Sequence, residues 1–307
     1  MAQYETKWLE AIDFDAILDY YDYPQEFYRE RLHQELDSLA KDEALNRICW
    51  LTHYILVHGS NEDILNVWTW GATPFQRHGS PTLCVVAMLA AQPFHTQTIA
   101  RCGYDEEQAE NSRKSLRNCW TGQRARGVDG VSFGLMLWMS YFVRCNLVRL
   151  GRLQYECGVR GFPKYDHLFE GEPVYIYIHI PPADNGLQDD EVAESIRQAR
   201  EKLAQYFPEI AAEGKTPVYC TNTWLLSPQL REFLKPDSNI MKFQNRFRVE
   251  GRTESVGAFL NFVFKVTELP GTFDYNTLPE DTHLRRELKS KILRGVPLEV
   301  GWGYIPM

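Results

Sequence analysis

Apolar and aromatic residues recur every three or four positions along the first half of the chain. Between residues 27 and 39 this spacing predicts an amphipathic helix, because it places the residues on one face. The positions concerned are Phe27, Tyr28, Leu32, Leu36 and Leu39.

Capping and stop residues bound further helices in this half. Asp42 is suited to cap a helix over 43–57 that Gly59 ends, and Pro81 suits the first turn of a helix over 82–91. Three more helices are predicted over 62–70, 106–121 and 131–147. The last of these is strongly apolar, so we expect it to lie at the centre of the helical part.

After residue 150 the pattern changes toward alternation. The clearest predicted strand is 174–180, which is β-branched and aromatic and ends at Pro181. Two more strands are predicted over 152–159 and 216–221. A helix over 189–207 is predicted from one apolar face, formed by Val192, Ile196, Ala199 and Leu203.

The last eighty residues continue the mixed pattern. A short helix is predicted over 229–234 and a helix over 281–293, whereas residues 301–307 receive no assignment. The apolar segment 256–266 fits either a helix or a strand, and the strand is favoured. The whole pattern predicts an α+β protein. Its expected domains are an all-helical one over 1–148 and a mixed α/β one over 149–307.

The charge balance of the 307-residue chain narrows the function classes. Lys and Arg number 33 against 41 Asp and Glu, so the formal net charge is −8. Binding to nucleic acid or to an anionic membrane needs a basic face, so neither partner is expected. The longest nearly apolar run, 81–94, is shorter than the roughly 20 residues that span a bilayer.

Cysteine usage indicates a reducing compartment. The seven cysteines are odd in number, and no pair has Cys-x-x-Cys spacing. They are interpreted as reduced core residues of a cytoplasmic protein, and no metal site is expected because paired ligand spacings are missing. The first residues also lack the basic and then apolar layout of a signal peptide.

Several short motifs occur together in the second half. They are Leu150-Gly-Arg-Leu-Gln154, Ile178-His-Ile-Pro181, Tyr206-Phe-Pro208 and Cys220-Thr-Asn-Thr-Trp224. With them, region 150–245 resembles bacterial two-domain acyltransferase-like proteins, which join an all-helical N-acyltransferase N-terminal domain to a GNAT-like C-terminal domain. The resemblance implies a GNAT-like fold for the second half. It also implies acyl transfer from acyl-CoA, as co-substrate, to a small-molecule acceptor.

The resemblance further implies how CoA is held. In GNAT enzymes one strand splays from its neighbour and its backbone pairs with the pantetheine arm, a role that falls here to Ile178 and Ile180. The following loop normally carries Gln/Arg-x-x-Gly-x-Gly/Ala and leads to a helix N-terminus that binds the pyrophosphate. Of those glycines only Gly186 remains here.

Acidic residues replace the rest of that loop. They are Asp184, Asp189, Asp190 and Glu191, all of which would repel a pyrophosphate. Either the phosphates bind elsewhere, or this domain no longer binds CoA. Arg124 and Arg126 are candidate replacement cations, with a solvated helix C-terminus as the alternative explanation of their position.

Acyl transfer also needs a base for the proton of the acceptor. Glu156 and His179 are the candidates, because each lies on a strand face with other polar or aromatic residues. If the two strands pair, Glu156 and His179 line one cleft. The alternatives are a structural ion pair for Glu156 and a core histidine bonded to backbone for His179.

Four other residues are candidates for the site. Cys220 ends an apolar strand before a polar turn, a place where open α/β sheets often carry active-site residues, and it is either a nucleophile or a small core residue. Trp224, Asn239 and Gln244 are candidate substrate contacts. The alternatives are packing for the tryptophan and a capping turn for the asparagine.

Two functions from different classes remain. The first is an acyl-CoA-dependent acyltransferase in which an amine or hydroxyl attacks the thioester directly. The second is a non-catalytic GNAT-like binding module that has lost the pyrophosphate loop. A thiol-dependent enzyme acting through Cys220 is a weaker third, and no oligomeric state is predicted.

Overall fold

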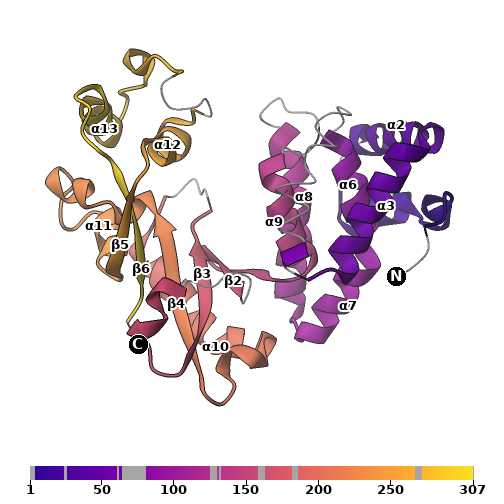
Figure 1. The fold of residues 1–307 in the computed structure, drawn as a ribbon, viewed down its shortest axis with the longest axis horizontal. Coiled ribbons are helices and arrows are strands. Elements are labelled where there is room, and N and C mark those ends of the chain that lie inside the picture. Colours follow the sequence, from indigo (N-terminus) through magenta and orange to yellow (C-terminus); the bar gives the residue numbers. More distant parts are fainter. Residues whose placement is uncertain are drawn as a thin grey trace. The chain divides into compact units, whose positions relative to one another are not determined.

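The computed structural model describes residues 4–23, 26–60, 62–63, 81–124, 130, 133–157, 163–181, 186–266 and 272–306. The chain divides into two compact units, Met1–Arg149 with Gln205–Phe207 and Leu150–Ala204 with Pro208–Met307. Figure 1 draws the first in indigo to magenta and the second mainly in pink to yellow. The first is helical and the second is built on a mixed sheet, which confirms the α+β class.

The helical unit is organised around one apolar helix. Its described elements are η1 (Trp8–Ala11), α1 (Phe14–Tyr20), α2 (Glu26–Lys41), α3 (Glu43–His58), α6 (Pro81–Leu89), α7 (Gln92–Cys102), α8 (Glu106–Arg124) and α9 (Phe133–Val143). α6 is apolar on every side, and its residues from Thr82 onward are buried. α2, α3 and α9 pack against it, so this helix forms the core of the unit.

Local signals place several of these helices correctly. The side chain of Asp42 accepts hydrogen bonds from the backbone N–H groups of Ala44 and Leu45, each at 3.0 Å. Gly59 follows the last turn of α3, as expected. Within the described residues no single helix could cross a membrane, and only the bent pair Thr82–Leu89 and Gln92–Cys102 meets that length and composition criterion jointly, across a 53° bend.

Two predicted helix ends are wrong. α8 does not stop at residue 121 but continues through Gly122 to Arg124, because Trp120 and Gln123 extend its buried face. The helix predicted to 147 already ends at Val143, since Cys145 takes a positive φ of 54°. Most of the predicted helix 62–70 lies outside the described residues.

The sheet unit contains six strands in the order β1-β2-β3-β4-β6-β5. They are β1 (Leu147–Leu150), β2 (Leu153–Cys157), β3 (Glu172–His179), β4 (Lys215–Thr223), β5 (Arg248–Glu254) and β6 (Glu299–Tyr304). β3 pairs with β4 in parallel, while β2 with β3, β4 with β6 and β5 with β6 are antiparallel. The three strands expected before residue 222 are therefore confirmed.

One face of the sheet packs against α10 (Asp189–Tyr206). All four apolar residues of the predicted helix face are buried. Ser195 anchors the helix to the sheet: its hydroxyl contacts the Tyr155 hydroxyl at 2.9 Å and accepts from the backbone N–H of Leu153 at 3.1 Å. Tyr219 on β4 donates to the Ala199 carbonyl of the same helix at 3.3 Å.

The opposite face carries Tyr175, Tyr177, Val218, Cys220 and Trp302 in one buried cluster. The short helix η2 (Pro163–Leu168) covers this cluster by stacking Tyr165 on Trp302, with ring centroids 3.9 Å apart and planes within 3°. This face matters for the site because, by strand alternation, it also carries Glu156 and His179.

Strand β6 was not predicted, although it lies inside the sheet between β4 and β5. Its sequence contains Gly301 and Gly303, which weaken a strand pattern. The structure explains both: a Cβ on Gly301 would lie 2.7 Å from Cβ of Leu226, and one on Gly303 would lie 2.8 Å from the Arg248 carbonyl oxygen.

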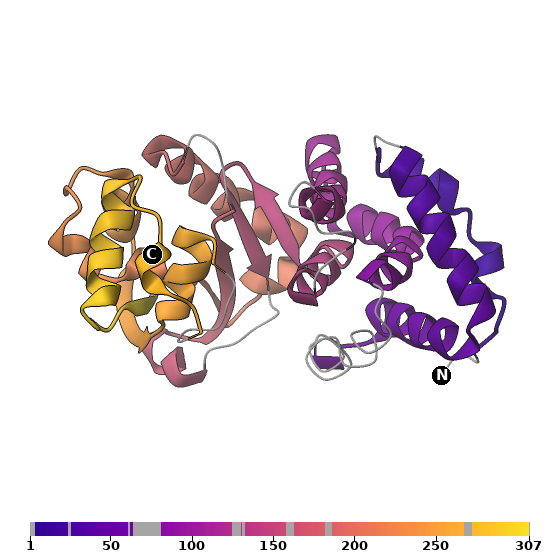
Figure 2. The same cartoon turned by 90° about the horizontal axis from the view of Figure 1, so that it is seen from above.

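The remaining segments pack beside β5 and β6 around a second apolar cluster. They include η4 (Trp224–Leu226), η5 (Pro228–Glu232), α11 (Asn239–Gln244), α12 (Val256–Phe259), the π-helix η6 (Leu260–Phe264), η7 (Tyr275–Thr277) and α13 (His283–Leu293). The short helix η3 (Pro208–Ala211) contacts β4 instead. The strand predicted over 256–266 is wrong: Ser255 caps a helix there, and Phe259, Leu260 and Val263 follow helical spacing into the cluster. Figure 2 shows α12 and α13 side by side in orange to yellow.

Candidate active site

A fork opens in the sheet between β3 and β4. Their parallel pairing runs from Glu172 with Lys215 to Tyr177 with Cys220, although both strands continue beyond that last pair. Past it, β4 keeps its pairing with β6 on the other edge, whereas toward β3 a side chain bridges the strands: Thr221 Oγ1 donates to the Ile178 carbonyl at 2.9 Å. The two strands therefore separate at the level of Tyr177.

The backbone of β3 faces this fork at alternate residues. The carbonyl of Ile178 points toward β4, since it accepts the Thr221 hydroxyl. Residues two apart in a strand present their backbone groups to the same side, so Ile180 faces the fork as well. Ile178 is buried and Ile180, just past the end of β3, is half-buried.

The two candidate bases are in direct contact. β2 and β3 pair with Gln154 opposite His179 and Glu156 opposite Tyr177, which places Glu156 diagonally across from His179 on the same face. His179 Nε2 lies 2.8 Å from Glu156 Oε2. The Glu156 side chain is 1% exposed and that of His179 is 16% exposed.

This contact determines how the imidazole is held. An ionised carboxylate only accepts hydrogen bonds, so Nε2 is the donor and, in the neutral ring, Nδ1 carries the lone pair. The His179 ring also stacks on Tyr177, with centroids 5.0 Å apart. A base held in this way by a carboxylate and a neighbouring ring is oriented for proton transfer.

The loop after β3 is attached at both described ends by one arginine. Arg152 donates to the Pro181 carbonyl at 2.7 Å and to the Gly186 carbonyl at 2.8 Å. Gly186 has a positive φ of 74°. Residues 182–185 lie outside the described part, and with them Asp184, one of the acidic residues expected to repel a pyrophosphate. The first turn of α10 that follows is acidic, with Asp189, Asp190 and Glu191.

Two other candidates lie in apolar surroundings. Cys220 is fully buried among Tyr175, Tyr177, Val218 and Trp302. Trp224 packs edge-on against Phe259, with centroids 6.0 Å apart.

The two candidate amides differ in exposure. Asn239 donates to the side-chain oxygen of Gln188 at 3.2 Å, on the surface. Gln244 is buried, and its amide nitrogen donates to the carbonyls of Leu225 and Ser227 at 3.0 and 2.8 Å. That arrangement makes Gln244 a clamp on the turn that follows β4.

The basic stretch of α8 is largely neutralised. Arg113 pairs with Glu106 and Glu110, and Arg117 pairs with Asp22. Arg124 lies over the ring of Phe27, with its guanidinium carbon 3.2 Å from the ring centroid. Arg126 lies outside the described residues.

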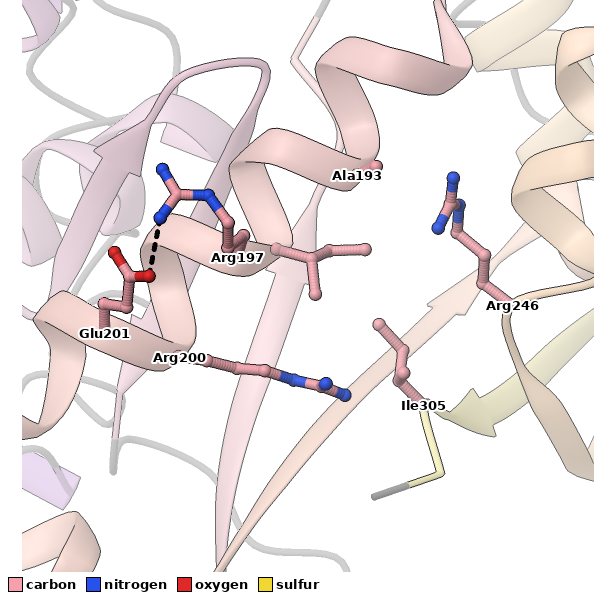
Figure 3. A pocket seen from close by; sticks show the side chains of 7 residues that line it. Ala193, Arg197, Arg200, Glu201, Arg246 and Ile305 are labelled. Carbon is pink, nitrogen blue, oxygen red and sulfur yellow. Dashed lines mark hydrogen bonds and ion pairs between the residues drawn. The ribbon is translucent and has the colours of Figure 1, made fainter.

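Sequence reasoning missed one pocket, of about 320 Å³, on the α10 side of the sheet. Its lining residues are Ala193, Ile196, Arg197, Arg200, Glu201, Arg246 and Ile305 (Figure 3). The spacing of Ala193, Ile196 and Arg200 places them on one helix face and could have indicated it. The far wall could not be paired with that face, because β6 was not predicted.

Among the described residues, no group of three or more His, Cys, Asp or Glu side chains is arranged to hold a metal ion.

Residues 147–305 match the model of the GNAT-like C-terminal domain. The chain belongs to this family. The match runs from β1 to β6, so it covers the described sheet of this GNAT-like chain. No curated protein sequence matches the chain.

Three solved structures resemble the GNAT-like chain beyond that domain. An acyltransferase in complex with CoA and 10C-teicoplanin has a TM-score of 0.68 and 21% identity, covering 95% of this chain and 87% of that one. An acyltransferase with decanoyl-CoA and teicoplanin has a TM-score of 0.67, 22% identity and the same coverages of 95% and 87%. An acyltransferase with decanoyl-CoA has a TM-score of 0.66 and 23% identity, covering 86% of this chain and 78% of that one. At these identities the likeness establishes a shared fold that includes the helical unit.

Proposed function

We propose that this protein is an acyl-CoA-dependent acyltransferase. The observation that carries the proposal is the Glu156–His179 pair, held at 2.8 Å on the strand that borders the fork. Membership of the GNAT-like family supports it, as do structural neighbours whose complexes contain CoA or decanoyl-CoA. The fork exposes the β3 backbone to a pantetheine arm at Ile180, two residues beyond the Ile178 carbonyl that accepts the Thr221 hydroxyl.

The reaction follows from the geometry of that pair. The acceptor's amine or hydroxyl attacks the thioester carbonyl carbon while His179 Nδ1 takes its proton, and Glu156 stabilises the imidazolium that forms. The tetrahedral intermediate collapses by breaking the carbon–sulfur bond. The departing CoA thiolate recovers the proton from His179, so no metal or redox partner is required.

The ligands of the structural neighbours suggest a more specific class of acceptor than amines and hydroxyls in general. Two neighbours were crystallised with teicoplanin or 10C-teicoplanin, so we propose a small-molecule acceptor of natural-product type. All seven cysteines are free thiols and buried, which supports a cytoplasmic site of action.

The acidic first turn of α10 favours a second candidate, a GNAT-like binding module without turnover. Asp189, Asp190 and Glu191 occupy the helix end where a pyrophosphate would otherwise bind. Such a module would lack any need for an oriented base, and the Glu156–His179 contact therefore favours the enzyme.

Titration calorimetry with CoA, acetyl-CoA and decanoyl-CoA tests the proposal directly. The enzyme is expected to bind at least the long-chain thioester in the micromolar range. With a panel of amine and hydroxyl acceptors it should then release free thiol. Absence of heat with all three compounds would overturn the acyl-CoA proposal, and binding without thiol release from any acceptor would favour the binding module.

A further inference from the structure

The pocket on α10 combines an apolar floor with a cationic rim. Ala193, Ile196 and Arg200 stand on one face of the helix, and Ile305 and Arg246 form the opposite wall. Figure 3 shows the Arg200 side chain reaching across the space between α10 and Ile305. At about 320 Å³ the pocket lies at the small end of ligand-binding cavities, so it suits one part of a large ligand.

The three guanidinium groups of the rim differ in how far they are compensated. Arg197 pairs with Glu194 at 2.6 Å and with Glu201 at 2.5 Å. Arg246 pairs with Asp189, yet its buried Nε–H has no acceptor among the described residues. Arg200 makes one described polar contact, a 3.4 Å hydrogen bond to the Pro306 carbonyl, and has no described carboxylate within ion-pair distance.

Arg200 is exposed at the pocket and has no described carboxylate partner, so its guanidinium is available to an anion from outside the protein. A guanidinium prefers a phosphate or carboxylate oxygen and binds it more strongly than a neutral acceptor. Apolar side chains beside it, Ile196 and Ile305, are suited to the face of a flat ring. A phosphorylated nucleoside combines these two features.

The pocket lies close to the base of the fork. The backbone N–H of Ile305 donates to the Tyr219 carbonyl at 2.8 Å, and Tyr219 directly precedes Cys220, the last residue of β4 that pairs with β3. Ala193 lies four residues into α10, about 6 Å along its axis from Asp189. A ligand arm leaving the fork on the α10 side would meet this pocket after passing the acidic first turn.

We propose that this pocket binds the phosphorylated adenosine end of the acyl-CoA, with Arg200 on a phosphate and Ile196 and Ile305 against the base. This inference rests on the proposed function. In it, Arg200 further along α10 takes the role of the missing pyrophosphate loop. The acidic first turn then serves the helix, where carboxylates are favoured by the dipole, and Asp189 fixes Arg246 at the pocket wall.

Arg200→Gln in the full chain tests the assignment, with Lys242→Gln as the matched control. Lys242 is an exposed cation on α11 outside the pocket, so both variants remove one positive charge. Calorimetry is expected to show CoA binding weakened about tenfold or more by Arg200→Gln, equivalent to about 1.4 kcal/mol, and changed less than about twofold by Lys242→Gln. S-decanoyl-pantetheine, which lacks the nucleotide, should have the same KM with both variants.

The outcomes separate the two proposals. Equal CoA affinities for Arg200→Gln and Lys242→Gln would overturn the pocket assignment while leaving the acyltransferase intact. An equal loss with S-decanoyl-pantetheine would also overturn it, because the effect would not depend on the nucleotide. Failure of the unaltered chain to bind any CoA compound would overturn the proposed function and, with it, the pocket.

Discussion

A carboxylate that is almost completely buried needs a partner, because an isolated buried charge is strongly destabilising. Glu156 is such a residue, at 1% exposure, and its described partner is His179. The same contact that satisfies Glu156 also fixes the orientation of the imidazole. At this scale the structural role and the proposed catalytic role are one interaction. Alternation along β2 and β3 predicted only that both residues line one cleft if the strands pair, and the pairing of the two strands then brings them into contact.

Replacing either member of the pair should reduce acyl transfer in different ways. His179→Gln removes the proposed base, and kcat is expected to fall by about 100-fold or more with little change in the KM for acyl-CoA. Glu156→Gln retains the shape but removes the charge that supports the imidazolium, so a smaller fall in kcat is expected together with a shift of the pH–rate profile. Steady-state kinetics from pH 5 to 9 measures both.

Cys220→Ala is the companion variant for that experiment. Cys220 lies buried in the aromatic cluster of the same sheet face, so its loss should leave most of the turnover in place. A Cys220→Ala variant as inactive as His179→Gln, in a protein that still folds, would instead support a thiol nucleophile.

At the scale of elements, a helix or strand was predictable where its residue pattern reflects its own buried face, and not where contacts distant in the sequence determine its residues. The spacing of Val192, Ile196, Ala199 and Leu203 predicts the buried face of α10. The β-branched and aromatic residues of β3 predict that strand. β6 was not predictable, because its glycines are required by Leu226 and Arg248, which are distant in the sequence. The sequence therefore predicted that Glu156 and His179 line one cleft if their strands pair. It did not predict the pocket on α10, because one wall of that pocket is formed by Ile305, next to the unpredicted strand β6.

The glycines of β6 give an expected change in stability. Gly303→Ala would place a Cβ 2.8 Å from the Arg248 carbonyl oxygen, which forces β5 and β6 apart, and a loss of about 1–3 kcal/mol in the free energy of unfolding is expected. Gly122→Ala in α8 is the control: its Cβ would meet nothing within 4 Å, and a helical alanine should stabilise by roughly 0.5–1 kcal/mol. Urea unfolding of both variants measures the difference, and an unchanged Gly303→Ala protein would contradict the close approach.

At the scale of the whole molecule, the two units are expected to respond differently to acid. The helical unit contains a buried histidine that the proposed reaction does not use: His95 Nδ1 lies 2.9 Å from the Tyr21 hydroxyl, and its Nε2 lies 2.9 Å from the Ser112 hydroxyl. All three side chains are buried. A neutral ring fits this network, because it offers one donor and one acceptor to two hydroxyls.

Burial, and then the nearby positive charge of Arg113, lowers the pKa of His95 from 6.5 to about 3. In the unfolded chain His95 therefore binds a proton below about pH 6.5, whereas in the folded unit it stays neutral down to about pH 3. The contribution of His95 to the free energy of unfolding is thus fully present above pH 6.5 and is lost as the pH falls toward 3. The expected loss is about 1.4 kcal/mol for each pH unit below 6.5. Hydrogen exchange of the α7 and α8 amides measures it in this unit alone.

His95→Gln isolates that contribution, since glutamine keeps polar contacts but does not titrate. The variant should be less stable at pH 7, because its amide cannot fill the imidazole's place. Its stability should nevertheless fall more slowly than that of the unaltered chain between pH 6.5 and 4.5, because the carboxylates that titrate there are common to both. Parallel pH dependences for the two proteins would show that the acid response arises from the carboxylates and not from the Tyr21–His95–Ser112 network.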